Sequence, residues 1–470
     1  MSTRSDHRLR QGSLGLSQII ASTLATIAPA MSFFFGFGVI VSGAGVGAPL
    51  TIVLAMVVIL FLTNTLAEFS RYRPSTGSFV TFIGMAFGPA AGTAAAIVAT
   101  AGYCIAAASV VVISGGWARS TWLLFAGNDI PWQLLSLLAT VLVGLLVARG
   151  VRLSTTWAAI FFYFELALLL IGALIMLVVH RAAIGWAPLL PSNISGGLAG
   201  VGAGFPLAIY LFIGWENSAM LAEETINPRR NVPRALITGT LAIGALYLLL
   251  AYSTEIAFDS DAAALAKSDI PFVDAFKGSA PSLLILAYLA GLTSIFSSLI
   301  GLTNSQARIL FSASREGMLP VVFVKIHPRH RTPHVAMWSF IGAALAIVIV
   351  FGYAYHIDPV TLFGETGTLG TIPIIVVYLV TNLALPVYML KFQRAEFRAV
   401  RHLVVPLAGA CLMLFPLYGL VEPGQAYPFS IYPYGVLALL LISGIYGVVL
   451  ARSTPDLVRR IGSYVADDKS

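Results

Sequence analysis

Continuous apolar runs of about 20 residues recur along the whole chain, and they constrain its fold more than any other feature. A helix of that length crosses the hydrocarbon core of a bilayer, whereas a membrane β-strand needs only about ten residues of alternating polarity. Hydrophobic residues make up 58% of the 470 residues and charged residues 10%. Water-soluble domains carry about 25% charged residues. The sequence therefore predicts an all-α membrane protein.

About twelve transmembrane helices are predicted from these runs. The predicted spans are residues 14–43, 47–69, 89–124, 131–148, 154–179, 199–221, 233–256, 281–312, 333–353, 360–388, 402–420 and 431–451. The first run is followed by no small-residue cleavage site, so we do not expect a cleaved signal peptide.

The positive charges predict an orientation. With the N-terminus in the cytoplasm, all 27 Lys and Arg residues fall on the cytoplasmic side except Arg119, Arg181, Lys267 and Lys277. Loops rich in Lys and Arg stay in the cytoplasm, so both termini are predicted to be cytoplasmic. The net charge of +7 then indicates topology and contact with membrane lipid, not a nucleic-acid partner. A bacterial inner membrane is the expected location.

Two predicted spans contain helix-breaking residues near their middle. Span 1 has Pro29, which removes a backbone donor. Span 6 has Gly202, Gly204, Pro206 and Gly214. Either break alone is ordinary, because proline and glycine are common in membrane helices. Breaks at matching places, five spans apart, are typical of an inverted-repeat transporter with its site at the break.

Four stretches give the sequence a resemblance to the amino acid–polyamine–organocation superfamily of permeases. They are LAEFSRYRPSTGSFVTFIGMAFGP (66–89), IYLFIGWENSAMLAEETINPRRNVPRA (209–235), LTNSQARILFSASREGMLP (302–320) and HPRHRTPHVA (327–336). The resemblance implies the leucine-transporter-type fold. It places a first repeat at 14–180 and an inverted second repeat at 199–388. Two appended spans follow at 402–451, with tails at 1–13 and 452–470.

The same resemblance implies a substrate site at the two breaks. Its expected residues are Thr26, Ile27, Ala28, Ala30, Met31 and Ser32 in span 1, Tyr103 in span 3, and Tyr210, Gly214, Trp215 and Glu216 in span 6. Tyr210 matches the outer gate aromatic of the family. Span 1 lacks the glycine-rich run with which many members hold a substrate carboxylate. Backbone amides freed around Pro29 are the expected substitute.

Glu216 and Glu165 are carboxylates inside apolar spans. Each costs roughly 2.5–3.5 kcal/mol to insert unless it faces protein, water or a cation. We expect Glu216 to attract a cationic amine or take up a proton; the alternative is a hydrogen-bonded acid that ties spans together. Glu165, in span 5, is expected to carry a proton or ligate a cation. The alternative is that it is a neutral, hydrogen-bonded acid with a structural role.

Hydroxyls in span 8 offer a competing ion site. Thr293, Ser294, Ser297 and Ser298 have the oxygen ligands that sodium prefers, although such residues also commonly bond neighbouring helices. Proton coupling is favoured because the two buried acids are titratable, and sodium is the alternative. Charged residues at the cytoplasmic ends of the spans suggest an inner gate of ion pairs: Glu68, Arg71, Arg73, Glu223, Glu224, Arg229 and Arg230.

The predicted function is a secondary active transporter for an amino acid or a related organic amine. A channel would need a continuous polar pore, and none is visible. No catalytic motif indicates an enzyme, and neither a cofactor nor a metal site is predicted; His327, His330 and His334 suggest a solvated loop. Whether the solute is zwitterionic or a polyamine, and whether transport is symport or exchange, stays open.

Overall fold

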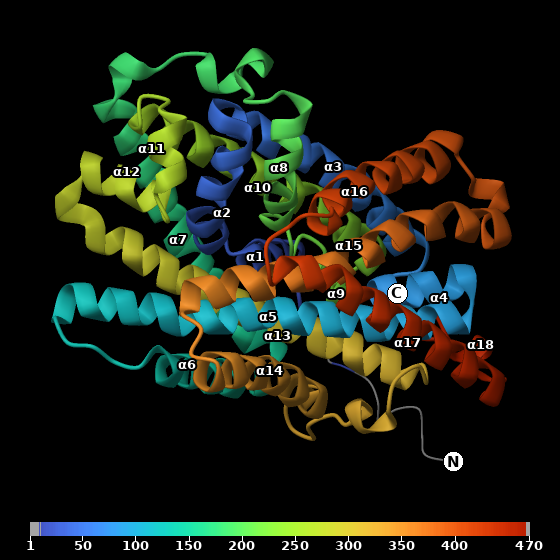
Figure 1. The fold of residues 1–470 in the computed structure, drawn as a ribbon. Helices are drawn as coiled ribbons and strands as arrows, with labels where there is room; N and C mark the ends of the chain where they lie inside the picture. Colours follow the sequence, from blue (N-terminus) through green and yellow to red (C-terminus); the bar gives the residue numbers. More distant parts are fainter. Residues whose placement is uncertain (1–8, 10, 467–470) are drawn as a thin grey trace.

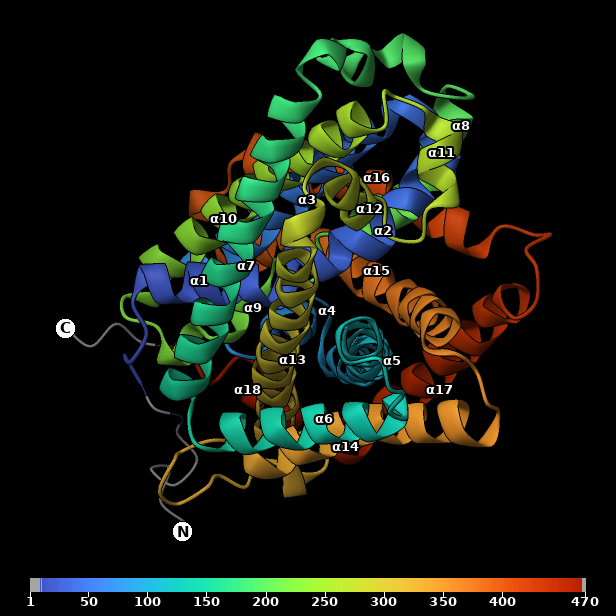
Figure 2. The same cartoon turned by 90° about the vertical axis from the view of Figure 1, so that its left-hand side faces the viewer.

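The computed structural model describes residues 9 and 11–466. The predicted cytoplasmic residues Arg4, Arg8, Arg10 and Lys469 lie outside this part of the chain. The described part is helical, with no regular strand; one isolated bridge joins Leu14 to Thr225. The long helices form one bundle, shown from two sides in Figures 1 and 2.

The first predicted span is two helices in the structure, α1 (Leu16–Ile27) and α2 (Pro29–Ala44). Ala28 separates them with a left-handed backbone, φ 54°. Pro29 then occupies the first turn of α2, where its missing amide hydrogen costs no helical bond.

Span 6 is also interrupted. It comprises α8 (Leu198–Tyr210), a run of turns at 211–216, and α9 (Asn217–Met220). Gly214, at φ 107°, has a backbone conformation that L side chains rarely adopt. The break lies later in the span than Pro206, which sits inside α8.

The two interrupted spans pack against each other at both ends. The pieces α2 and α8 approach through glycines, since a Cβ on Gly43 would lie 2.7 Å from the amide nitrogen of Gly204. The pieces α1 and α9 are joined by polar side chains: Thr23 Oγ1 lies 2.5 Å from Ser218 Oγ, and Asn217 Nδ2 donates to Ser22 Oγ at 3.1 Å.

The remaining helices surround this pair. They are α3 (Ala48–Tyr72), α4 (Ser78–Phe87), α5 (Pro89–Ala126), α6 (Trp132–Ala148), α7 (Val151–Val179), α10 (Pro228–Ala257), α11 (Ala262–Lys267), α12 (Pro271–Ser279), α13 (Leu284–Arg315), α14 (His334–Ile349), α15 (Pro359–Phe392), α16 (Val405–Val421), α17 (Tyr432–Ser453) and α18 (Leu457–Arg460). Figure 2 views α5 nearly end on, with α13, α15, α17 and α6 around it.

Nine segments of the described chain are long and apolar enough to cross a membrane. One of them, Leu16–Tyr72, contains α1, α2 and α3 in 57 residues. The apolar helices Trp132–Ala148 and Ala199–Tyr210 are shorter. The protein is therefore a multi-pass helical membrane protein, and the count of twelve spans stays a prediction.

Candidate functional site

Side chains of helix α13 form hydrogen bonds with the backbone at the break between α1 and α2. Ser297 Oγ donates to the Ala25 carbonyl at 3.1 Å, and Ser298 Oγ donates to the Thr26 carbonyl at 3.0 Å. The Met31 amide donates to Ser294 Oγ at 3.0 Å. These bonds satisfy the backbone carbonyl and amide groups that have no partner within a helix at the break.

The break of span 6 touches the break of span 1. A Cβ on Gly214 would lie 3.1 Å from Thr26 Cγ2 and 3.2 Å from the Ile27 amide nitrogen. Ser32 Oγ donates to the Ile27 carbonyl at 2.8 Å. All six predicted span 1 residues are buried here: Thr26, Ile27, Ala28, Ala30, Met31 and Ser32.

Glu216 lies at this junction and is 1% exposed. Tyr103, from α5, donates through its hydroxyl to Oε1 of the carboxylate. Tyr378, from α15, donates to Oε2 at 3.1 Å, and the Gly214 amide donates to the same oxygen at 3.1 Å. Three donors therefore satisfy a buried carboxylate that has no ion-pair partner among the described residues.

The sequence indicated Tyr103 and Glu216 but not Tyr378. Tyr378 stands in an apolar stretch of α15, and its ring contacts Trp215 edge to face at 5.9 Å between centroids. A tyrosine hydroxyl in the middle of an apolar span needs a partner, which is the one signal that would have singled it out. Together the three side chains join α5, the interrupted span 6 and α15.

A cavity of about 340 Å³ lies on one side of these breaks, between α2, α8, α11 and α15. Phe35, Tyr210 and Phe363 are its aromatic lining, and Ser268 and Asp269 line it in the loop after α11. Of the predicted substrate residues, only Tyr210 lines this cavity. The Tyr210 ring meets Phe363 edge to face at 6.3 Å, and its hydroxyl lies 3.3 Å from Ser109 Oγ.

Glu216 and Glu165 do not line any described cavity. Glu365, an acid in α15, is half-buried and does not line the 340 Å³ cavity either. The junction of the two breaks is thus closed to solvent in this conformation.

Glu165 projects from α7 into the bundle and is fully buried. Neither carboxylate oxygen has a hydrogen-bond partner in the described part of the chain, although Ser294 is close enough to interact with it. Ser294 also accepts the Met31 amide bond, so one hydroxyl lies between Glu165 and the break of span 1. Thr293, in contrast, bonds only carbonyls of its own helix within the described part of the chain.

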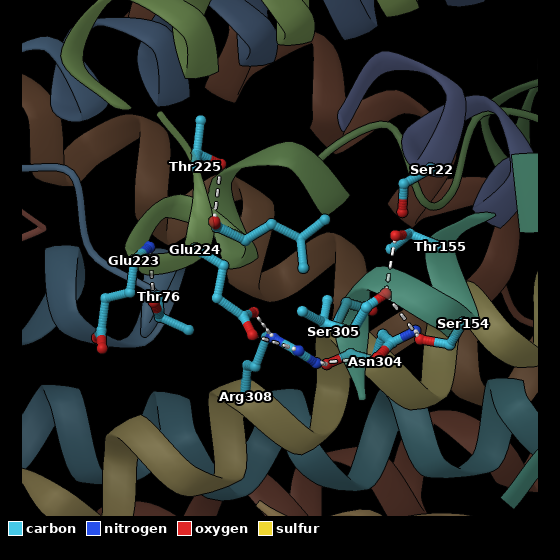
Figure 3. A network of polar contacts seen from close by, with 12 residues as sticks. Ser22, Thr76, Ser154, Thr155, Glu223, Glu224, Thr225, Asn304, Ser305 and Arg308 are labelled. Carbon is cyan, nitrogen blue, oxygen red and sulfur yellow. Dashed lines mark hydrogen bonds and ion pairs between the residues drawn. The ribbon is translucent and has the colours of Figure 1, made fainter. Parts of the chain in front are cut away.

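The opposite side of the breaks is closed by buried ion pairs. Arg308 forms two bonds to the Glu224 carboxylate, and Arg315 forms two to Glu223. Arg308 also donates to Asn304, whose side-chain amide donates to Ser154 Oγ at 2.9 Å (Figure 3).

The expectation that Arg73, Arg229 and Arg230 take part in this gate is wrong. All three are exposed, and among the described residues none of them forms an ion pair. The two acids pair instead with Arg308 and Arg315, because α13 passes beside them. Glu68 pairs with Arg71 at 2.8 Å, as expected for residues one helical turn apart.

Comparison with known proteins identifies the family. The sequence model of the amino acid permeases matches residues 18–423. The chain belongs to the amino acid permease family. Its members are transporters and not enzymes, and the protein is a multi-pass membrane transporter of this family.

Two of the relatives share most of their length with this permease, and a third matches a shorter stretch. The branched-chain amino acid permease BcaP of Bacillus subtilis is 25% identical over 416 residues, which cover 81% of this chain and 82% of the relative. The methylthioribose transporter of the same organism is 25% identical over 409 residues, covering 82% and 83%. Cationic amino acid transporter 6 of Arabidopsis thaliana is 30% identical over 175 residues, covering 35% and 29%.

Proposed function

We propose that this permease moves an amino acid or a related organic amine across the cell membrane by alternating access. The observation that carries the proposal is the contact between the two helix breaks, with Glu216 buried at the junction. Residues at the junction have backbone groups outside regular helices, which is where transporters of this kind bind solute and coupling ion. Family membership supports transport of an amino acid-like solute.

The proposed substrate residues are those of the two breaks together with Tyr103, Tyr210 and Tyr378. Glu216 would receive the amine, which would replace the tyrosine donors around the carboxylate. Tyr210 and Phe363 would separate this site from the 340 Å³ cavity. The ion pairs of Glu223 and Glu224 would close the other side.

The proposed architecture is twelve spans, with two inverted repeats of five. Packing between predicted equivalents supports it: the interrupted pair contact each other, and α3 packs on α10, α5 on α13 and α6 on α14. The distribution of Lys and Arg supports cytoplasmic termini in a bacterial inner membrane.

We propose a proton as the coupling ion, carried by Glu165. This carboxyl is buried without a hydrogen-bond partner and lies beside Ser294, which bonds the span 1 break. Loss or gain of its proton would change the Ser294 hydrogen bond and with it the span 1 backbone. Sodium is less favoured, because the Ser297 and Ser298 hydroxyls already donate to the carbonyls that an ion would need.

Uptake into proteoliposomes tests the coupling. Under a pH gradient, wild type should concentrate solute in the presence or absence of sodium, and Glu165→Gln should lose the response to the gradient. Glu422→Gln, which changes an exposed acid in the turn after α16, is the matched control. An unchanged pH profile in Glu165→Gln removes Glu165 from coupling, and a strict sodium requirement in wild type rejects proton coupling.

A polyamine or simple amine exchanger is the second candidate. One observation favours it: the Met31 amide, which a substrate carboxylate would need, is already bonded to Ser294. Thermal-shift measurements with amino acids and their decarboxylated amines separate the two. Stabilisation by amino acids alone indicates a carboxylate site, whereas equal stabilisation by the amines indicates that Glu216 dominates recognition.

A further inference from the structure

A second large cavity, of about 390 Å³, lies at the end of the bundle that carries the ion pairs. Four segments enclose it: the end of α3, the corner between α4 and α5, the end of α15, and the C-terminal segment, defined as residues 454–466. The lining residues are Arg73, Gly84, Met85, Gly88, Pro89, Tyr388, Phe392, Gln393, Val458 and Ile461.

The C-terminal segment is fixed in place by its own contacts. Its Ile461 packs so closely on α4 that a Cβ on Gly84 would lie 2.9 Å from Ile461 Cγ2. The Ala466 amide donates to the Pro74 carbonyl at 2.9 Å. The Tyr464 ring covers the Arg315 guanidinium at 4.0 Å. The cavity wall made by this segment is therefore part of the folded structure.

The side chains that line the cavity are mostly apolar, with Gln393 and one positive group. Among the described residues Arg73 is the only charged one in the lining, and its side chain is exposed. Glu68, the acid nearest to it in sequence, pairs with Arg71 and Arg401 instead. The cavity thus presents, beside a hydrophobic wall, a guanidinium that none of the described acids pairs with.

Exposed apolar side chains surround the same place. Phe392 is 58% exposed and Val458 63% exposed, and both line the cavity. Phe87, 42% exposed, ends α4 at the same corner. Lys391 lies beside Phe392 and donates to the Ala86 carbonyl at 3.0 Å. Exposed apolar side chains next to long basic side chains fit the boundary between acyl chains and headgroups, which Lys and Arg near helix ends reach.

We propose that this cavity binds an anionic phospholipid, with the phosphate on Arg73 and the acyl region against Phe392 and Val458. Apolar walls disfavour a free anion, and the guanidinium disfavours a neutral lipid. A bound lipid contacts the ends of α3 and α15 and the C-terminal segment at once. It therefore stabilises the closed arrangement of this end, where Tyr464 covers the Arg315–Glu223 pair. The proposal does not depend on which solute is transported.

The test uses the full chain in nanodiscs of neutral lipid, to which phosphatidylglycerol is added in steps while thermal stability is followed. Wild type should gain stability in a saturable way. Arg73→Gln should bind about fivefold more weakly, the factor expected when one arginine is removed from an anionic lipid surface. Arg229→Gln, an exposed arginine at the same end and outside the cavity, is the control and should behave as wild type.

A second measurement needs no variant. A photoreactive phosphatidylglycerol should label peptides containing residues 85–89, 388–393 and 458–461 in wild type, and unlabelled phosphatidylglycerol should compete. Equal binding by Arg73→Gln and Arg229→Gln, or labelling spread evenly over the lipid-facing helices, would overturn the proposal. Equal stabilisation by glycerol phosphate would also overturn it, because the site would then recognise a free anion.

Discussion

The buried Glu224–Arg308 ion pair should keep the end of the permease that carries the ion pairs closed, and the size of its effect can be worked out from the structure. Both side chains are 1% exposed, and the guanidinium makes two bonds to the carboxylate. We consider Glu224→Gln, which keeps the size of the side chain and removes its charge. Arg308 is then left buried without its counter-charge, since its other partners are the carbonyl oxygens of Asn304.

The size of the effect follows from this burial. Breaking a buried ion pair by removing one partner costs about 3–5 kcal/mol, because the remaining charge is uncompensated. If opening of this end hydrates Arg308, the whole cost falls on the closed conformation. At 1.4 kcal/mol per factor of ten, the open population rises by about 100- to 4,000-fold.

Alkylation of a buried cysteine measures that population. Ser305→Cys, on α13 one turn before Arg308, is 1% exposed in the closed conformation, and its rate of reaction reports opening. Cys104 and Cys411 are replaced beforehand. Glu224→Gln should accelerate alkylation at least tenfold, and Asp456→Asn, an exposed acid at the same end, should leave it unchanged. Equal rates in the two variants would refute a role for the pair in closure.

Two further predictions concern single positions. Gly214→Val should reduce uptake by at least tenfold, because its φ of 107° and the 3.1 Å approach to Thr26 leave no room for a side chain, whereas Gly342→Ala, in open space, should leave uptake unchanged. Burial raises the pKa of Glu316, just beyond α13, to about 8, against the opposing effects of Arg315 and Thr81. Between about pH 4.5 and pH 8 the folded state therefore keeps this carboxyl protonated, whereas the unfolded state releases the proton. The free energy of unfolding should fall as the pH rises through this range. The melting temperature of Glu316→Gln should depend less on pH over this range, and an identical slope in both proteins would contradict the assignment.

Composition and periodicity were sufficient to predict the helical membrane class and most helix ends. The two interrupted spans also followed from local chemistry, since Pro29 and Gly214 each mark a place where a regular helix is unfavourable. The sequence offered several helix-breaking residues in span 6, and α8 continues past one of them, Pro206, to Tyr210. Tertiary packing decides at which of several helix-breaking residues the helix ends.

Partners across the bundle were harder to predict. The sequence singled out Glu223 and Glu224 but paired them with nearby arginines, whereas the structure pairs them with α13, more than 80 residues away. Tyr378 was missed for a related reason: its hydroxyl in an apolar span signals that it needs a partner, but the sequence does not show that the partner is Glu216. Such pairings depend on helix packing, which a single sequence does not specify.

The central claim is that a solute amine meets Glu216 where the two interrupted helices touch, and that the permease moves this solute across the membrane by alternating access. Counterflow in proteoliposomes measures this directly, by preloading unlabelled solute and following entry of the labelled compound. The account predicts saturable entry stimulated by the preload in wild type and loss of that stimulation in Glu216→Gln, with Glu422→Gln unaffected. Stimulated counterflow of normal rate and affinity in Glu216→Gln would contradict it.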